Sequence, residues 1–175
     1  MIASVTTPRF ILREFRLTDV EALFAVDSDP EVVRYLGNKT LNTHAEVEEV
    51  IHMVRKQYED FGIGRWIVEN KLTGEVVGWC GLKWIEDNGE DRKQYYDVGY
   101  RLARKHWGQG IATECALASL DYAFNVIKTK EVFAAASIDN GASNRVLQKI
   151  GMQNIGRFFY DDIECNWYRI ENPAE

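Results

Sequence analysis

The segment HWGQGIATECA, from His106 to Ala116, constrains the fold of this chain more than any other stretch. Gly108 and Gly110 stand between a predicted strand and a predicted amphipathic helix. Because glycine has no side chain, the backbone N–H groups of a tight turn can approach an anion there. The helix dipole favours the same anion by about 0.3 to 1 kcal/mol, and by up to ~2 kcal/mol in a partly buried site. The segment therefore predicts a strand, turn and helix that bind a phosphate-bearing ligand.

Other phosphate and metal motifs do not match. The chain has no GxxxxGK[ST] sequence, and Thr113 stands where the third glycine of GxGxxG would be. Thr113 instead adds a hydroxyl to the first helical turn. His44 and His52 are eight positions apart on one predicted helix and His106 stands alone, so no metal site is expected. The expected ligand is a nucleotide-type anion bound without a metal.

Hydrophobic periodicity and turn residues divide the chain into strands and helices. The predicted strands are residues 9–16, 65–69, 76–85, 95–102, 131–137, 152–160 and 163–170. The predicted helices are residues 18–27, 30–36, 43–62, 110–124 and 140–150. The polar run at 86–93 is predicted to be a loop. The strand at 95–102, the helix at 110–124 and the strand at 131–137 form a β-α-β unit around the two glycines.

Local signals mark where several of these elements begin. Thr18 with Glu21, and Thr43 with Glu46, have the spacing of a capping box, in which two side chains satisfy backbone N–H groups at a helix start. The pair at 161–162 is predicted to be the turn of the last hairpin. These signals predict a chain of closely connected elements in a single domain spanning residues 1–175.

Composition limits the class of protein. With 175 residues, 46% of them hydrophobic, the chain can fill one core. The net charge of -6 argues against an extended nucleic-acid surface and suits an amine-bearing partner better. The odd, scattered cysteines predict neither a disulfide framework nor a zinc site; they are Cys80, Cys115 and Cys165. No leader and no apolar run of roughly 18 residues is evident, so we expect a cytoplasmic protein without membrane contact.

Three segments of the chain together resemble one known family. They are TPRFILREFRLTDVEAL at 7–23, YDVGYRLARKHWGQGIATECA at 96–116 and NGASNRVLQKIGM at 140–152. The chain resembles the GCN5-related N-acetyltransferase (GNAT) superfamily, specifically its RimJ/RimL-type branch of ribosomal-protein N-terminal acetyltransferases. The resemblance implies an α+β fold with a mixed, mostly antiparallel, twisted sheet of about seven strands flanked by helices. It also implies that the sheet splays between 95–102 and 131–137, where acetyl-CoA would lie.

The resemblance also implies which residues bind acetyl-CoA. Pantetheine would pair with the backbone of 98–101, and the pyrophosphate would rest on the N–H groups of 107–112. The full cofactor set is Val98, Gly99, Tyr100, Arg101, Trp107, Gly108, Gln109, Gly110, Ile111, Ala112, Thr113, Asn140 and Asn144. Trp107 stands where the wider superfamily has Arg or Gln. We interpret it as a core aromatic that seats the loop, and the alternative is a direct contact with the ligand. The alternative for Asn140 is that it caps the helix after it.

The group that protonates the departing thiolate differs from the superfamily pattern. Many members have a tyrosine in the helix predicted at 140–150, whereas Leu147 stands at that position here. Ser143 is the replacement that we predict as the acid. The alternative is that Ser143 only caps the helix.

Two carboxylates lie near the cofactor motif and could accept the proton of the attacking amine. An α-amine, with a pKa of about 7.7 to 8.0, needs little help, whereas a lysine at about 10.4 needs ~4 kcal/mol more. Asp97 is the preferred base because it shares one strand face with Gly99 and Arg101. Glu114 is the second candidate. The alternatives are a surface ion pair for Asp97 and a favourable first-turn charge for Glu114.

These observations predict an acetyl-CoA-dependent N-acetyltransferase that transfers the acetyl group directly within a ternary complex, since no Cys–His pair is placed for a covalent intermediate. The expected acceptor is the α-amine of a protein or peptide. The alternatives are a small amine (an amino-acid derivative, aminoglycoside or polyamine), a non-catalytic acyl-CoA-binding domain and an interaction module in which the glycines only form a turn. We expect a homodimer.

Overall fold

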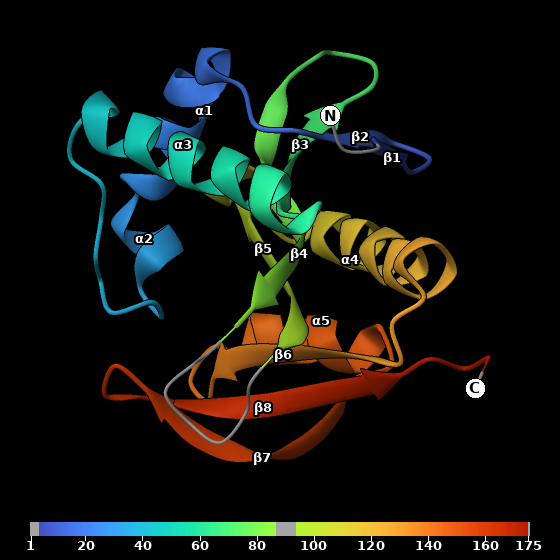
Figure 1. Ribbon diagram of the computed structural model, residues 1–175. Coiled ribbons are helices and arrows are strands. Elements are labelled where there is room, and N and C mark those ends of the chain that lie inside the picture. The colour runs from blue at the N-terminus through green and yellow to red at the C-terminus, as the bar shows by residue number, and fades with distance from the viewer. Residues whose placement is uncertain (1–3, 87–93, 175) are drawn as a thin grey trace.

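The computed structural model describes residues 4–86 and 94–174 and contains one eight-stranded sheet in the order β1-β2-β3-β4-β5-β6-β8-β7 (Figure 1). The strands are β1 (Val5–Thr6), β2 (Phe10–Arg13), β3 (Arg65–Asn70), β4 (Val76–Ile85), β5 (Tyr95–Leu102), β6 (Glu131–Ser137), β7 (Gln153–Tyr160) and β8 (Ile163–Glu171). Neighbouring strands are antiparallel except β5 and β6, which are parallel. The predicted α+β fold is confirmed; the additional strand, β1, is too short for hydrophobic alternation to mark it.

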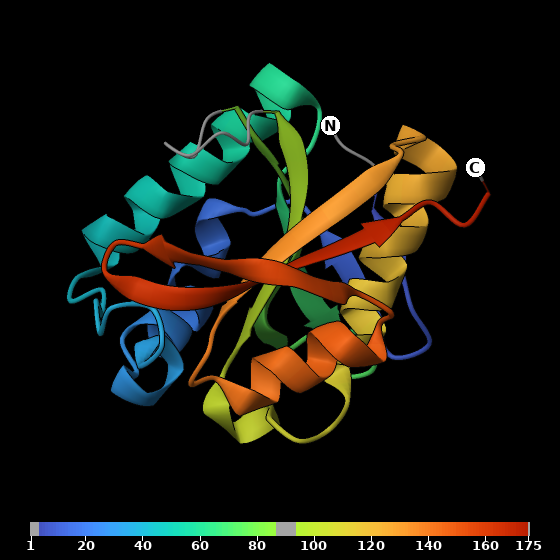
Figure 2. The same cartoon turned by 90° about the horizontal axis from the view of Figure 1, so that it is seen from below.

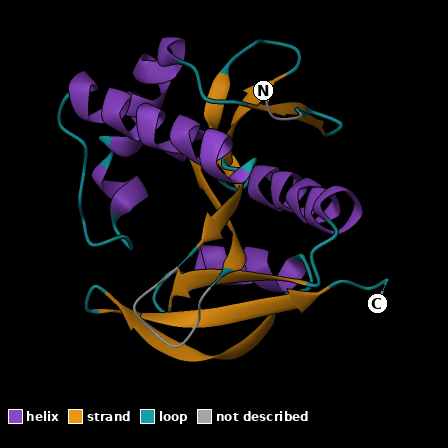
Figure 3. Cartoon of the chain, in the orientation of Figure 1, coloured by secondary structure: helices purple, strands orange, loops and turns teal. Residues whose placement is uncertain are grey.

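Helices cover both faces of the sheet (Figure 3). They are α1 (Val20–Asp27), α2 (Pro30–Val33), α3 (His44–Phe61), α4 (Ile111–Tyr122) and α5 (Gly141–Lys149). The apolar stripe of α3 packs with α1 against Ile67 of β3 on one face. Residues of α4 and α5, among them Cys115 and Leu147, join the larger core on the other face. The β5-α4-β6 unit is as predicted.

The start of α3 is as predicted and the start of α1 is not. Thr43 Oγ1 accepts a hydrogen bond from the N–H of Glu46 at 3.2 Å, which completes the capping box. Thr18 makes no such bond, so its predicted capping box is wrong. Instead, Asp19 accepts a hydrogen bond from the N–H of Arg16 at 2.7 Å and stabilises a 3₁₀ turn that precedes α1. The side chain of Asp19 is buried, which favours capping by Asp19 over capping by Thr18.

One predicted helix is shorter in the structure, the last hairpin turn has the expected backbone, and one predicted loop is described only in part. The helix predicted at 30–36 is shorter, because α2 ends at Val33. The turn between β7 and β8 has both Asp161 and Asp162 at positive φ, 44° and 64°, the backbone of a two-residue hairpin turn. Of the loop predicted at 86–93, residues 87–93 lie outside the described residues.

Within the described ranges, no helix is long and apolar enough to span a membrane.

The parallel strands β5 and β6 separate soon after they meet. Asp97 and Phe133 form their single registered pair, after which β5 stays with β4 and β6 stays with β8. Figure 2 shows β6 running obliquely across the direction of β4 and β5. Within the described part of the chain, residues 98–102 therefore have a strand partner only on the β4 side. The predicted splay of the sheet is present at the predicted strands.

Candidate active site

A left-handed glycine turn joins the end of β5 to α4. Gly108 and Gly110 have φ values of 72° and 73°, a region that L side chains rarely adopt. Within the described residues, the N–H groups of Gly108 and of 110–113 donate no hydrogen bond inside the protein, while Gln109 closes the turn at 107–108. These N–H groups and the dipole of α4 form a cradle suited to an anion, as the two glycines predict.

Trp107 seats this turn from the surface. Its indole Nε1 donates a hydrogen bond to the carbonyl of Leu102 at 2.9 Å, while its side chain remains 46% exposed. Its own N–H donates to the carbonyl of Arg104 at 3.1 Å. The prediction of a core aromatic is therefore wrong in its burial, and the set of available N–H groups begins at Gly108, one residue later than predicted.

The basic residues before the turn are paired with carboxylates. Arg104 lies 3.2 Å from Asp29, and Lys105 and His106 lie 2.5 Å and 3.3 Å from Glu75. The hydrogen bond from Lys105 is the main cause of a lowered pKa at Glu75. Arg104 and Lys105 thus form ion pairs at the rim of the turn, which reduces the positive charge that they offer to a ligand.

Glu114, the second candidate base, is held by the N-terminal segment. It accepts hydrogen bonds from Thr7 Oγ1 at 2.6 Å, the N–H of Arg9 at 3.0 Å and Arg9 Nε at 2.6 Å. Arg9 Nη2 in turn donates to the carbonyl of Gln109 at 3.0 Å. Burial alone would raise the pKa of Glu114, but the bonds from Thr7 and Arg9 outweigh burial and lower it. Glu114 therefore connects the glycine turn to the segment between β1 and β2, a role that its sequence neighbourhood does not reveal.

The N-terminus of α5 contains a cap and a saturated amide. Asn140 Oδ1 accepts from the N–H of Ser143 at 3.1 Å, so Asn140 is the helix cap. Asn144 Nδ2 donates to the carbonyls of Ser137 and Asn140, at 2.8 and 2.7 Å. Its Oδ1 accepts from two further side chains, those of Asn166 and Tyr168, at 2.8 and 2.7 Å. An amide has two donor hydrogens and two acceptor lone pairs, so the side chain of Asn144 has none left for a cofactor. The side chain of Asn144 thus ties α5 to β6 and β8, and a contact of its backbone with the cofactor stays a prediction.

Tyr100 reaches from β5 to the start of α5. Its hydroxyl lies 3.0 Å from Ser143 Oγ and donates to the Ser143 carbonyl at 3.1 Å. Burial is the main cause of the raised pKa of Tyr100, so the phenol stays protonated at neutral pH. The sequence pointed to the backbone of Tyr100 alone. The structure adds its hydroxyl, which stands beside Ser143 at the start of α5.

Asp97 lies on the opposite face of β5, in a partly buried ion pair. Its side chain pairs with the Nη2 of Arg65, and Arg65 Nη1 also donates to the Asp97 backbone carbonyl at 2.7 Å. The Asp97 and Arg65 side chains are only 18% and 13% exposed, so this is not a surface ion pair. The guanidinium lies over Gly99. Arg65 is a site residue that sequence reasoning missed, because nothing in its own segment marks it.

Charged and aromatic groups continue along this face. The guanidinium groups of Arg65 and Arg101 lie 5.5 Å and 5.3 Å from the ring centroid of Trp79, and Arg101 also pairs with the buried Asp27 at 2.5 Å.

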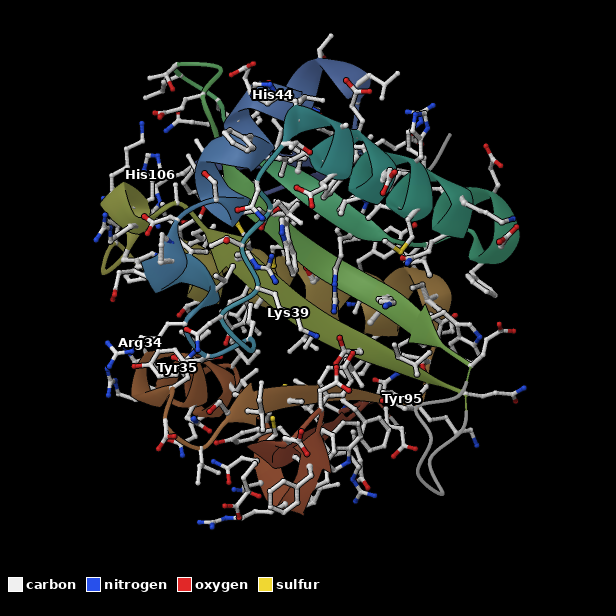
Figure 4. The ribbon with its side chains drawn as sticks, turned by 90° about the vertical axis from the view of Figure 1, so that its left-hand side faces the viewer. Arg34, Tyr35, Lys39, His44, Tyr95 and His106 are labelled. Atoms are coloured by element: carbon white, nitrogen blue, oxygen red, sulfur yellow. The ribbon has the colours of Figure 1, made fainter. Side chains whose placement is uncertain are left out.

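Beyond the β5–β6 junction the same face becomes aromatic. Tyr95, Phe133 and Phe158 surround Trp167 with centroid distances of 5.1 to 5.3 Å. Figure 4 looks onto this face, with Tyr95 where β5 meets β6. Asp97 therefore lies between an ion-paired region and an aromatic wall.

The described residues form neither a reactive thiol site nor a metal-binding cluster. Cys80, Cys115 and Cys165 are free and buried. Burial raises the pKa of the Cys80 thiol to about 12 and raises that of the others, so the thiols stay protonated at neutral pH. Across residues 4–86 and 94–174, no group of three or more His, Cys, Asp or Glu side chains could hold a metal ion.

Comparison with known proteins identifies relatives over most of the chain. A family model described as an acetyltransferase (GNAT) domain matches residues 9–153. YkkB, an uncharacterized protein of Bacillus subtilis, is 35% identical over 149 residues, covering 85% of this chain and 84% of YkkB. YoaA, an uncharacterized N-acetyltransferase of the same organism, is 29% identical over 181 residues and covers 100% of both chains.

Solved structures share the fold at lower identity. RimL, a ribosomal L7/L12 α-N-protein acetyltransferase in complex with coenzyme A, matches with a TM-score of 0.82 at 16% identity, covering 99% of this chain and 100% of RimL. A spermidine N-acetyltransferase from Vibrio cholerae, in complex with CoA and spermine, matches with a TM-score of 0.73 at 19% identity, covering 93% and 95%. Because the GNAT model spans the β5-α4-β6 unit and most of the remaining fold, this chain belongs to the GNAT family and is an acetyl-CoA-dependent N-acetyltransferase.

Proposed function

We propose that the acceptor is the α-amine of a protein or peptide, as in a RimJ/RimL-type enzyme, and that transfer is direct in a ternary complex. The observation that carries this proposal is the Arg65–Asp97 pair, which puts one ordered carboxylate on the strand next to the split. A carboxylate is a weak base. It suits an α-amine, which is partly neutral near pH 8, better than a lysine or polyamine amine that stays protonated.

The chain has a fitting place for acetyl-CoA. The unpaired edge of β5 at 98–101 could bond the pantetheine amides, and the N–H groups of Gly108 and of 110–113 could hold the pyrophosphate. At Gly108 an added Cβ would meet no atom within 4 Å, so the outer side of the turn is open. When bound, acetyl-CoA supplies a thioester whose carbonyl carbon can be attacked by an amine.

Asp97 is proposed as the general base of this reaction. Its carboxylate takes the proton that the amine loses as nitrogen bonds to carbon. Arg65 orients the carboxylate with bonds to its side chain and to its backbone carbonyl. The protonated, buried thiols leave no nucleophile for a covalent intermediate among the described cysteines.

Ser143 and Tyr100 are proposed to supply a proton as the carbon–sulfur bond breaks. The two hydroxyls lie 3.0 Å apart. If the Tyr100 O–H turns from the Ser143 carbonyl to Ser143 Oγ, it can replace the proton that Ser143 gives to sulfur, and the phenolate then regains its proton from solvent after the product leaves. One proton is thereby accepted on the Asp97 side and one is donated on the α5 side, and no group is oxidised or reduced.

The proposal is tested in two steps. Thermal unfolding with acetyl-CoA, and with ATP and NAD as controls, should show selective stabilisation of about 2.7 kcal/mol at 100 times the Kd. Release of CoA thiol is then measured with a peptide that has a free α-amine, the same peptide acetylated at its N-terminus and bearing a lysine, and spermidine. Turnover with the first peptide alone supports the proposal. Turnover only with spermidine would assign a polyamine acceptor, and binding without turnover would indicate an acyl-CoA-binding domain.

A further inference from the structure

Lys83 is a cation on the face that carries Asp97, and no described residue forms an ion pair with it. It lies on β4 directly opposite Asp97 of β5, so the two side chains leave the same face of the sheet. Lys83 is half-buried, and it makes no hydrogen bond or ion pair within residues 4–86 and 94–174. Arg65 and Arg101, which lie on the same face, each pair with a carboxylate.

The surroundings of Lys83 are unfavourable for an isolated ammonium. Burial and the neighbouring Arg65 lower its pKa, and Asp97 opposes this effect only in part. Asp97 is itself engaged by Arg65 through the side chain and the backbone carbonyl. Partial burial of a charge is costly unless a counter-charge arrives. A bound anion that is not one of the described residues would therefore stabilise the charge of Lys83.

Another cation stands on the loop that crosses this face. Lys39 is exposed on the loop after α2, and Figure 4 shows it in front of β5. The same loop approaches β8, because an atom added at Gly37 would lie 3.8 Å from Ile163 Cδ1. Lys39 and Lys83 thus both bring positive charge to the side of the sheet that carries Asp97. This arrangement disfavours an acceptor with several positive charges.

We propose that Lys83 binds a carboxylate that the acceptor carries beside its reacting amine. Adjacent strands lie about 4.8 Å apart, which suits an amine at Asp97 and a carboxylate of the same residue at Lys83. The carboxylate belongs either to a free amino acid or to an aspartate or glutamate at the first position of a peptide. This inference rests on the proposed acetylation of an α-amine and adds a requirement for a negative charge.

The test compares matched acceptors with matched variants. Peptides beginning with Asp or Asn, and with Glu or Gln, differ in charge while keeping the α-amine; free glutamate distinguishes the amino-acid source. With the unmodified enzyme, we expect KM for the acidic peptide, or for glutamate, to be about tenfold lower than for the amide peptide. Lys83→Met should remove this difference without changing KM for acetyl-CoA, and Lys83→Arg should restore it. Lys56→Met, at an exposed lysine of α3, is the control.

The outcomes separate this inference from the proposed function. Equal KM values for acidic and amide peptides, with turnover intact, would overturn the role of Lys83 and leave α-amine acetylation standing. Loss of kcat with every acceptor in Lys83→Met would also overturn it, because Lys83 would then act in the reaction itself. If no α-amine is acetylated while acetyl-CoA still stabilises the enzyme, the proposed function fails first.

Discussion

The guanidinium of Arg65 lies over Gly99 and pairs with Asp97, two positions earlier on β5. An added Cβ at Gly99 would lie 2.8 Å from Arg65 Nη2, closer than a real Cβ contact. The missing side chain at this position therefore makes room for the arginine that orients the proposed base. The resemblance implies that the backbone of Gly99 pairs with pantetheine, and the contact with Arg65 is a separate reason for glycine at this position.

Asp97→Asn should lower kcat by about 10²-fold at pH 7, because the amide keeps the shape of the side chain but cannot accept the amine's proton. The deficit should shrink as the pH rises past about 8, where the α-amine becomes neutral in solution. Initial rates of thiol release between pH 6.5 and 9.5 check this. Asp121→Asn, at an exposed position of α4, is the matched control. A deficit of the same size at every pH would remove Asp97 from the role of base.

Tyr100→Phe should lower kcat by up to about 10²-fold and leave KM for acetyl-CoA unchanged, because only the hydroxyl that reaches Ser143 is lost. Since burial raises the pKa of Tyr100, the native enzyme should keep this proton donor up to at least pH 10. Steady-state kinetics of this variant and of Ser143→Ala check the prediction. Full turnover in both variants would mean that the thiolate leaves without an acid from the enzyme.

Glu114→Gln should weaken the connection of the glycine turn to the segment between β1 and β2. We expect a loss of about 1 to 3 kcal/mol in the free energy of unfolding at pH 7. We also expect a raised KM for acetyl-CoA with kcat retained. The native pKa of Glu114 is lowered, so its stabilisation is present above the unfolded value of 4.5 and fades as the pH falls below it. Denaturant unfolding of the native enzyme and of Glu114→Gln checks this, because their free energies of unfolding should differ at pH 7 and become similar at pH 3.5. A collapse of kcat with unchanged KM would instead identify Glu114 as the base.

Alkaline pH should destabilise the fold as it rises above about 9, where unfolded cysteine begins to ionise. Burial raises the pKa of Cys80 from 9.0 to about 12, and it also raises the pKa values of Tyr58 and Tyr100 above 10.0. The unfolded chain ionises first, so the stability is complete below pH 9 and is lost as the pH rises from there. Melting temperatures from pH 7.5 to 11 check this. Cys80→Ala should make the decline shallower by up to about 1.4 kcal/mol per pH unit, and an unchanged slope would contradict the assignment.

Most of the fold follows from local patterns in the sequence. The α3 stripe of Val47, Ile51 and Val54 and its capping box predict that helix, and alternation predicts the longer strands. Two local features were beyond these patterns. β1 has two residues and no periodicity, and Asp19 caps its turn because it is buried beside Arg13, a tertiary contact.

The candidate site was predictable where backbone conformation carries the function. Gly108 and Gly110 predict the anion-binding turn from the sequence, and both have the positive φ that favours glycine. Side-chain partners were not predictable, because Arg65 reaches Asp97 from 32 positions away and Tyr100 meets Ser143 across 43. Strand alternation could have put Tyr100 on the opposite face from Asp97, but only the divergence of β5 from β6 brings its hydroxyl to α5. The two hydrogen bonds that Asn144 Oδ1 accepts likewise come from side chains of β8, which is distant in the sequence.

The position of the transferred acetyl group tests the proposed function most directly. A peptide with a free N-terminal aspartate and an internal lysine is incubated with the enzyme and acetyl-CoA, and tandem mass spectrometry locates the added group. We expect acetylation at the α-amine alone, greatly reduced at pH 7 in Asp97→Asn. Acetylation at the lysine, or of spermidine but not of the peptide, would contradict the proposed acceptor and the role given to the Arg65–Asp97 pair.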